Sequence, residues 1–100
     1  MTIYIDEIRN WGKRGDWCHM MADGDIEELH TFARRIGLQR AWFQAKNPRH
    51  PHYDLRPSKR VLAVKAGAVE VSYAELLQRC TLYQDIARDM AALAEEGQPR

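Results

Sequence analysis

The sequence has 100 residues, 45% of them hydrophobic, and a formal net charge of +1, which together predict one small domain with a single core. No apolar run approaches the ~20 residues needed to cross a bilayer, and the first residues lack the basic and apolar segments of a signal peptide. We therefore exclude a membrane protein and expect a cytoplasmic one, in which the distant cysteines Cys18 and Cys80 are free buried thiols.

The first half of the chain is predicted to alternate strands with one helix. Asp6 ends a β-rich segment, and residues 9–16 are turn-rich and charged, which is typical of a loop. Asp25 and Glu28 have the spacing of a capping box, and Gly37 lies where a left-handed helix end would fall. The expected elements are strands at 2–5, 17–21 and 40–43 and a helix at 26–36.

The second half begins with a long loop and ends with two helices. Residues 44–56 carry turn signals and no apolar period, so we expect a loop of about a dozen residues, a length that is usually functional or disordered. Pro57 suits the first turn of a second helix and Gly67 its end, followed by a strand at 68–71. Ser72 with Glu75 predicts the start of a third helix.

The third helix is longer than so small a domain needs. Its apolar residues follow alternating spacings of three and four from Tyr73 to Ala94, which is a heptad seam. We expect one α/β domain over 1–100, with a short mixed or mostly parallel sheet flanked by three helices. The long C-terminal helix would project over 83–97 and pair with a second copy in a homodimer.

Charge is concentrated in the middle of the chain. Residues 34–65 carry nine basic side chains and only Asp54 as an acid, whereas residues 1–33 have a net charge of −4 and residues 66–100 of −3. Such a block favours an anionic partner, a nucleotide or a nucleic acid. The alternative is that the block folds against the acidic ends of its own chain.

Two interpretations of the loop histidines stay open. In an extended segment, His50, His52 and Asp54 would point the same way and could converge on a divalent ion such as zinc, manganese or iron. Because this short motif is a weak match to known metal sites, we favour the alternative, in which His52 and Asp54 brace the loop by hydrogen bonds. We therefore assign no metal ligands and leave a divalent metal open.

The start of the second helix is a candidate phosphate site. A helix N-terminus beside cations attracts anions, and Asp54 would help to pre-set this helix start. The alternative is that the basic residues form the solvated face of the helix. The candidate ligand-binding residues are Arg40, Tyr53, Arg56, Lys59 and Arg60.

Candidate catalytic residues come from two parts of the chain. His52 with Asp54 would orient a ligand or transfer protons, since a carboxylate fixes a histidine tautomer. Asp6 follows a strand at an edge where ligands collect in open α/β sheets, and His19 would face the same edge. His30 is expected to be a structural histidine at the margin of a helix stripe.

Aromatic residues add a further candidate contact. Trp11 lies in a polar loop next to Lys13 and Arg14, and we expect it to be exposed. Trp42 and Phe43 end an expected strand, where core positions are more usual.

Several motifs together resemble a bacterial and phage family of small proteins, the domain of unknown function numbered 4031. The resemblance covers the chain to about residue 80 and implies a compact domain often encoded in phages and prophages, with no established reaction. It omits His50 and the C-terminal helix. The motifs are Ile3-Tyr4-Ile5-Asp6, Trp17-Cys18-His19-Met20 with Asp23, Glu27-Glu28-Leu29-His30-Thr31-Phe32-Ala33, Ile36-Gly37-Leu38, Arg40-Ala41-Trp42-Phe43-Gln44, His52-Tyr53-Asp54, Lys59-Arg60 and Gly67-Ala68-Val69.

Two functions are consistent with these patterns. The first is binding of a phosphate-bearing ligand, a nucleotide or a nucleic-acid strand, in the basic loop, with phosphodiester hydrolysis as the natural reaction. The second is a non-catalytic phage or prophage accessory protein that binds another protein through its third helix.

Overall fold

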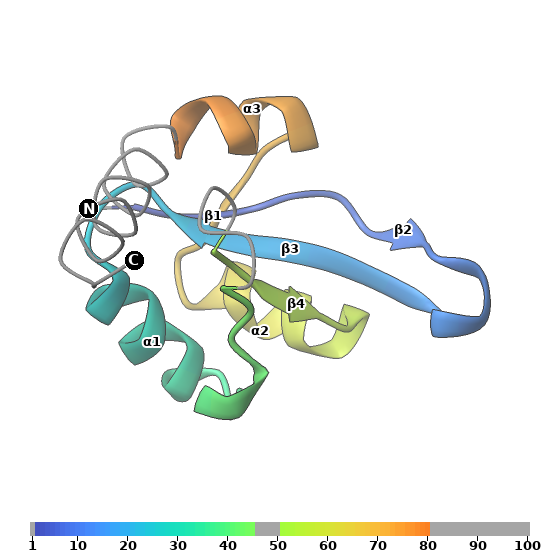
Figure 1. Cartoon of the computed structure of the whole chain (residues 1–100), viewed down its shortest axis with the longest axis horizontal. Helices are drawn as coiled ribbons and strands as arrows, with labels where there is room; N and C mark the ends of the chain where they lie inside the picture. Colours follow the sequence, from blue (N-terminus) through green and yellow to red (C-terminus); the bar gives the residue numbers. More distant parts are fainter. Residues whose placement is uncertain (1, 46–50, 81–100) are drawn as a thin grey trace, which may run out of the picture.

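The structure, a computed structural model, describes residues 2–45 and 51–80 and forms a small α/β domain (Figure 1). The described residues form five short strands, three α-helices and two 3-10 turns, and after the first three strands helices and strands alternate. In order they are β1 (Ile3–Ile5), β2 (Arg9–Asn10), η1 (Gly12–Arg14), β3 (Asp16–Ala22), α1 (Ile26–Arg35), η2 (Arg40–Trp42), β4 (Tyr53–Leu55), α2 (Pro57–Lys65), β5 (Val69–Glu70) and α3 (Tyr73–Arg79).

The sheet is mixed and built around β3. The strands follow the order β2-β3-β1-β5, and β4 pairs with β3 as well. Among the described strands, β1 and β5 are the one pair that runs parallel, while β3 runs antiparallel to β1, β2 and β4. The predicted α/β class and mixed sheet are confirmed, and antiparallel pairing predominates.

Two clusters of buried residues cover the two faces of the sheet. Side chains of a strand alternate between faces, so β3 directs Cys18 and Met20 to one face and Met21 to the other. The first face packs against α1 and α2, and the second packs against Leu76 of α3. Figure 1 shows the same layers, with α1 and α2 on one side of β3 and α3 on the other.

The predicted helix ends are confirmed by their hydrogen bonds. The Asp25 side chain accepts from the Glu27 backbone N–H at the start of α1, and the Ser72 hydroxyl accepts from the Glu75 backbone N–H at the start of α3. Gly37 has a φ of 86° after α1, a conformation that favours glycine. Pro57 is the first residue of α2, where its missing N–H costs no helical hydrogen bond.

The predicted strand at 40–43 is wrong. Residues Arg40–Trp42 form the 3-10 turn η2, which follows the close of α1. The turn directs the two aromatic side chains to different environments. Phe43 packs against the core, while Trp42 remains 46% exposed. With no partner strand beside it in the described chain, β propensity alone does not make a strand here.

Two predicted loops contain secondary structure. Residues 9–16 include β2 and η1, and they lead into β3, which begins at Asp16. Residues 44–56 were expected to be a loop throughout, yet Tyr53–Leu55 form β4, and Gln44 pairs with His52 in a β-bridge. The alternation of buried and partly exposed side chains over Tyr53–Leu55 is only three residues long. The prolines on both sides of it are typical of a loop, and this explains why the sequence predicts one.

The third helix begins where it was predicted. The heptad seam beyond Cys80 and the projecting helix at 83–97 lie outside the described residues. Within the described part of the chain, none of the helices has the length and apolar character needed to traverse a bilayer.

Candidate functional site

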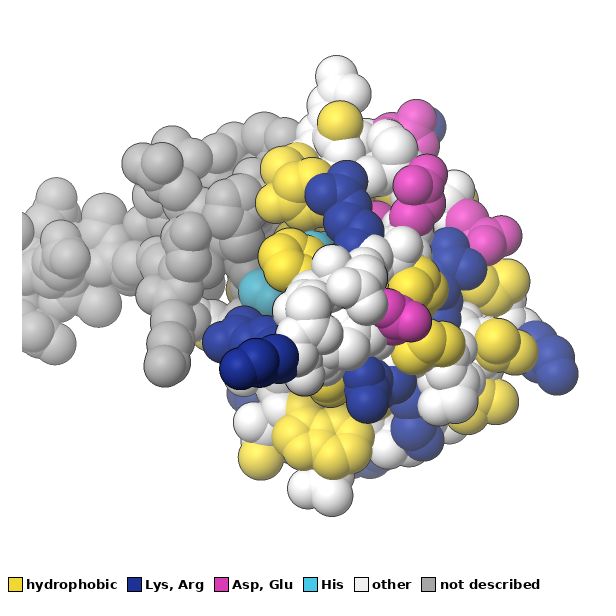
Figure 2. Space-filling view, turned by 90° about the vertical axis from the view of Figure 1, so that its right-hand side faces the viewer, with side chains coloured by type: hydrophobic (Ala, Val, Ile, Leu, Met, Phe, Trp, Pro, Cys, Tyr) yellow, Lys and Arg dark blue, Asp and Glu magenta, His cyan; other side chains and the backbone are white. Residues whose placement is uncertain are grey.

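A cleft opens on the α3 face of the sheet, beyond the part of the sheet that α3 covers. It has a volume of about 430 Å³, which is in the usual size range of small-molecule sites. Figure 2 views the β2–β3 end of the molecule, where basic and apolar side chains surround histidine side chains. The cleft is lined by Trp11, Arg14, Trp17, His19, Gln44, His52 and Asp54.

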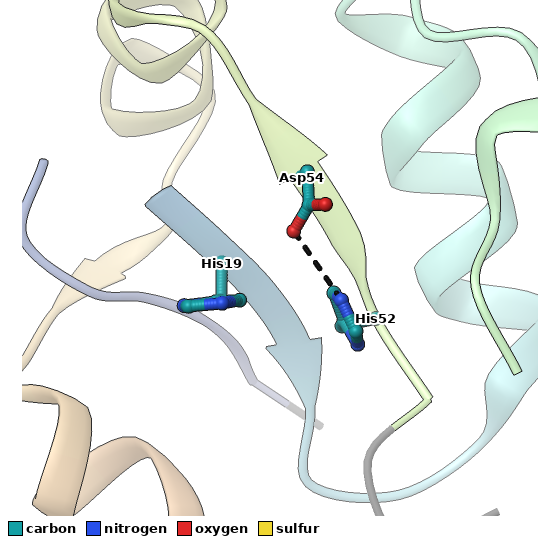
Figure 3. A group of neighbouring side chains, drawn as sticks. All are labelled: His19, His52 and Asp54. Carbon is teal, nitrogen blue, oxygen red and sulfur yellow. Dashed lines mark ion pairs between the residues drawn. The ribbon is translucent and has the colours of Figure 1, made fainter. Parts of the chain in front are cut away.

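Strand register brings three of the predicted site residues together. His19 on β3 lies directly opposite Asp54 on β4. His52 is two residues before Asp54, so the alternation of an extended chain places it on the same face. Figure 3 shows the two histidines and the carboxylate gathered across the two strands. One ligating atom from each residue lies within 4.8 Å of the other two.

Asp6 fixes the orientation of His19. Its side chain is fully buried, and its carboxylate accepts hydrogen bonds from the backbone N–H and from Nδ1 of His19, the latter at 2.8 Å. An ionised carboxylate only accepts hydrogen bonds, so in the neutral form of the imidazole this contact places the proton on Nδ1 and leaves Nε2 with its lone pair. Asp6 and His19 were both predicted near this sheet edge, and the structure brings them together.

A bulge separates Asp6, whose backbone N–H still donates to the His19 carbonyl oxygen on β3, from β2. Ile5 pairs with Met20 and Arg9 with Trp17, so the β1–β2 segment uses four steps where β3 uses three. The extra residue falls within 6–8. Bulges are often found next to functional sites, because they redirect side chains out of the regular alternation.

His52 and Asp54 form the second histidine–carboxylate pair. His52 Nε2 lies 3.3 Å from Asp54 Oδ1, and Gln44 Nε2 donates to the other carboxylate oxygen. Burial alone would raise the pKa of Asp54, but the hydrogen bond and charge of His52 together with the Gln44 hydrogen bond lower it below its ordinary value. Asp54 is therefore ionised at neutral pH. It does not cap α2, whose N-terminus has no side-chain cap.

His19, His52 and Asp54 form the polar floor of the cleft, and aromatic and basic side chains surround them. The Trp11 and Tyr73 rings lie 6.0 Å and 5.4 Å from the His19 ring. Trp11 is 47% exposed, as its sequence context predicts. The Arg56 guanidinium lies over the Trp17 ring at 4.8 Å, and that of Arg9 over Tyr73 at 5.1 Å.

The predicted phosphate-binding cations do not meet in one pocket. Arg60 donates to the Asp6 backbone oxygen at 3.0 Å and pairs with Glu70 at 2.9 Å, so its guanidinium supports the sheet edge. Lys59 lies beside Gly37, and Arg40 lies over the Phe43 ring. Of the predicted cations, Arg56 is the one that contacts a wall of the cleft.

Tyr53 is part of the core and not of the cleft. It is 1% exposed on the α1 side of the sheet, and its hydroxyl lies 2.8 Å from His30 Nδ1. Burial, followed by the charge of Arg40, lowers the pKa of His30, which is therefore neutral at pH 7. His30 has the structural role that its place on the helix predicts.

A comparison with known families places this chain. A family model described as Protein of unknown function (DUF4031) matches residues 3–82. The chain belongs to the DUF4031 family. No curated protein and no solved structure gave a match. The family description names no reaction, so function in this DUF4031 member is argued from the cleft.

Sequence reasoning missed four residues that line the cleft or contact it. Gln44 ends one motif of the family resemblance and Tyr73 begins the apolar seam of the third helix, and neither pattern predicts a site role. Both residues reach this DUF4031 site through the β-bridge and the start of α3. Trp17 was placed in a strand, with no sign of which face it takes. Arg14 was noted as a neighbour of Trp11, and that adjacency was the one available signal.

The buried cysteines of this DUF4031 chain are expected to resist alkylation. Cys18 and Cys80 are free and buried, and burial is the main cause that raises the pKa of each thiol to about 12. Since the thiolate is the reactive form, iodoacetamide at pH 8 should leave both thiols unmodified in the native protein and modify both in urea. Intact mass spectrometry measures the uptake, and rapid native labelling of Cys18 would contradict its burial.

Proposed function

We propose that the cleft binds a phosphate-bearing ligand, a nucleotide or a nucleic-acid strand, and hydrolyses its phosphodiester bond. The observation that carries the proposal is the meeting of His19, His52 and Asp54 in the lining of one cleft, with the fully buried Asp6 hydrogen-bonded to His19 beneath it. Titratable side chains that converge in a cleft and are oriented by a further carboxylate support acid–base or metal-assisted chemistry.

The rim supplies the groups that a nucleotide needs. Trp11 offers an exposed indole on which a base can stack. Arg14 lines the same cleft, and Arg56 lies over Trp17 on its wall, which supports a role for both in contacting phosphate oxygens. We therefore assign phosphate binding to Arg14 and Arg56, because Lys59, Arg60 and Arg40 have contacts elsewhere.

The floor activates the attacking water. Hydrolysis adds one water across a P–O ester bond. The water oxygen bonds to phosphorus, the ester oxygen leaves, and one proton moves from the attacking water to the departing ester oxygen. His19 and His52 each offer a ring nitrogen, and Asp54 offers a carboxylate, within 4.8 Å of one another. These groups are able to accept that proton or to hold an ion that lowers the pKa of the water.

Rim substitutions test ligand binding. Trp11→Ala should weaken binding of a fluorescein-labelled single-stranded oligonucleotide by about tenfold, because it removes the stacking of one base on the indole ring. Arg14→Ala should reduce the salt dependence of binding by about one phosphate contact. Fluorescence anisotropy from low to high salt measures both quantities.

Two neighbouring residues provide matched controls. Trp42 is as exposed as Trp11 but does not line the cleft, and Lys13 is an exposed cation next to Arg14. Trp42→Ala and Lys13→Ala should bind like the wild type. Failure of the wild type to bind oligonucleotides or nucleotides at low salt would exclude the proposed function.

Other parts of the hypothesis rest on the sequence alone. A cytoplasmic location agrees with two free buried thiols. A homodimer through the C-terminal helix, and the alternative role as a phage or prophage accessory protein, concern residues outside the described part of the chain and stay predictions.

A further inference from the structure

We propose that His19, His52 and Asp54 form a binding site for a divalent transition-metal ion, with zinc and manganese as the best candidates. The catalytic use of the ion rests on the proposed function, because the ion would activate the attacking water. Binding of the ion does not, because it requires no phosphate ligand.

The distances between the ligating atoms suit an ion. Two ligands at about 2.1 Å from a tetrahedral ion lie about 3.4 Å apart. His52 Nε2 and Asp54 Oδ1 already lie 3.3 Å apart, and the ligating atom of His19 is within 4.8 Å of both. Rotation of the partly exposed His52 and Asp54 side chains closes the remaining difference, while Asp6 holds the His19 ring and paired strands hold all three backbones.

Asp6 supports the metal site by holding His19, although it is not itself one of the three ligating residues. Histidine ligands of metals commonly donate their second ring N–H to a carboxylate, which fixes the tautomer and makes the ligating nitrogen more basic. The buried Asp6 carboxylate accepts a hydrogen bond from Nδ1–H of His19 at 2.8 Å, so Nε2 is the nitrogen left for an ion. A loop brace by His52 and Asp54 gives no reason for His19 to be fixed in this tautomer opposite Asp54.

The donor set indicates the class of ion. Imidazole nitrogen favours zinc, iron and similar ions, and the Asp54 carboxylate also suits manganese, whereas magnesium and calcium prefer sites made of oxygen ligands alone. Three protein ligands leave at least one coordination position for water, which is the pattern of catalytic rather than structural zinc sites. The cleft in front of the three residues gives that position access to a ligand.

Calorimetry on EDTA-treated, dialysed protein tests the site. Titration with zinc or manganese chloride should show one ion per chain, and magnesium chloride should bind far more weakly. His19→Ala, His52→Ala and Asp54→Ala should each weaken binding by more than about 100-fold, the upper range for loss of an outer-shell partner. Asp16→Ala is the matched control, because it removes an exposed carboxylate from β3, the strand that carries His19, without changing any of the three ligating residues, and it should leave the affinity unchanged.

Asp6→Asn tests the positioning role. The asparagine amide would donate to Nδ1 and move the ring proton to Nε2, so the affinity for zinc should fall by about 10- to 100-fold. Visible absorption of the cobalt-loaded protein reports the coordination geometry and should lose its tetrahedral signature in His19→Ala. Circular dichroism checks the fold of each variant, and His19→Gln replaces His19→Ala if the latter is unfolded.

The outcomes separate the metal site from the proposed function. Zinc and manganese binding no tighter than magnesium, or equal losses in Asp16→Ala and His19→Ala, would overturn the metal site. Oligonucleotide binding in EDTA is measured independently. Metal binding without oligonucleotide binding would support the site and reject the proposed function, and the reverse result would reject the site alone.

Discussion

Replacing Asp6 by alanine should lower the free energy of unfolding by about 3 kcal/mol, because a buried charged acceptor is removed from two donors that remain. The Asp6 side chain is fully buried and accepts from the backbone N–H and the ring Nδ1 of His19. Alanine leaves the backbone donor inside the protein with no acceptor. Since small domains are stable by only ~5–15 kcal/mol, the loss should be large in urea denaturation.

An acidic residue in the same sheet serves as the control. Asp16 begins β3 and accepts from the Asn10 side chain at 2.9 Å, but this hydrogen bond is exposed to solvent. Asp16→Ala should therefore cost under about 1 kcal/mol. Equal effects of the two substitutions would show that Asp6 does not hold His19 in a buried contact.

The helices were predictable because their signals are local. Asp25, Ser72, Pro57 and Gly37 each act within one helical turn, so residue type and spacing are enough to place the helix ends. The order of strands and helices likewise gave the α/β class. Such local signals do not depend on contacts with distant parts of the chain.

The strands were harder because their partners lie far away in the sequence. β4 has three residues, and its identity depends on pairing with β3, more than thirty positions earlier. Nothing in residues 52–55 alone distinguishes such a strand from an extended loop. Conversely, Trp42 and Phe43 look like a strand but have no sheet edge to join in the described chain.

The candidate site was predicted in pieces and assembled only by the fold. His52 with Asp54 were paired from their spacing, and Asp6 with His19 from their place at a strand end. The register between His19 and Asp54 joins these pieces, and register is a tertiary property. The predicted cluster of cations failed to form for the same reason, since Arg60 is directed to Asp6 and Glu70 by the packing of α2.

Leu55→Ala distinguishes a core strand from the long loop that the sequence predicts. Leu55 is fully buried on β4, so its truncation should cost about 2–5 kcal/mol through lost burial and the cavity left behind. Leu62 on α2 is 44% exposed, and Leu62→Ala should cost about 0.5 kcal/mol or less. Urea denaturation measures both variants.

The Leu55 result also bears on the site. Because Leu55 anchors the strand that carries Asp54 opposite His19, its loss should loosen the contact between the two histidine–carboxylate pairs. The line broadening of the His19 and His52 ring signals in NMR spectra should then increase in Leu55→Ala and remain unchanged in Leu62→Ala. A cost near 0.5 kcal/mol for Leu55→Ala would mean that β4 is not part of the core, and the strand pairing that assembles the site would be lost with it.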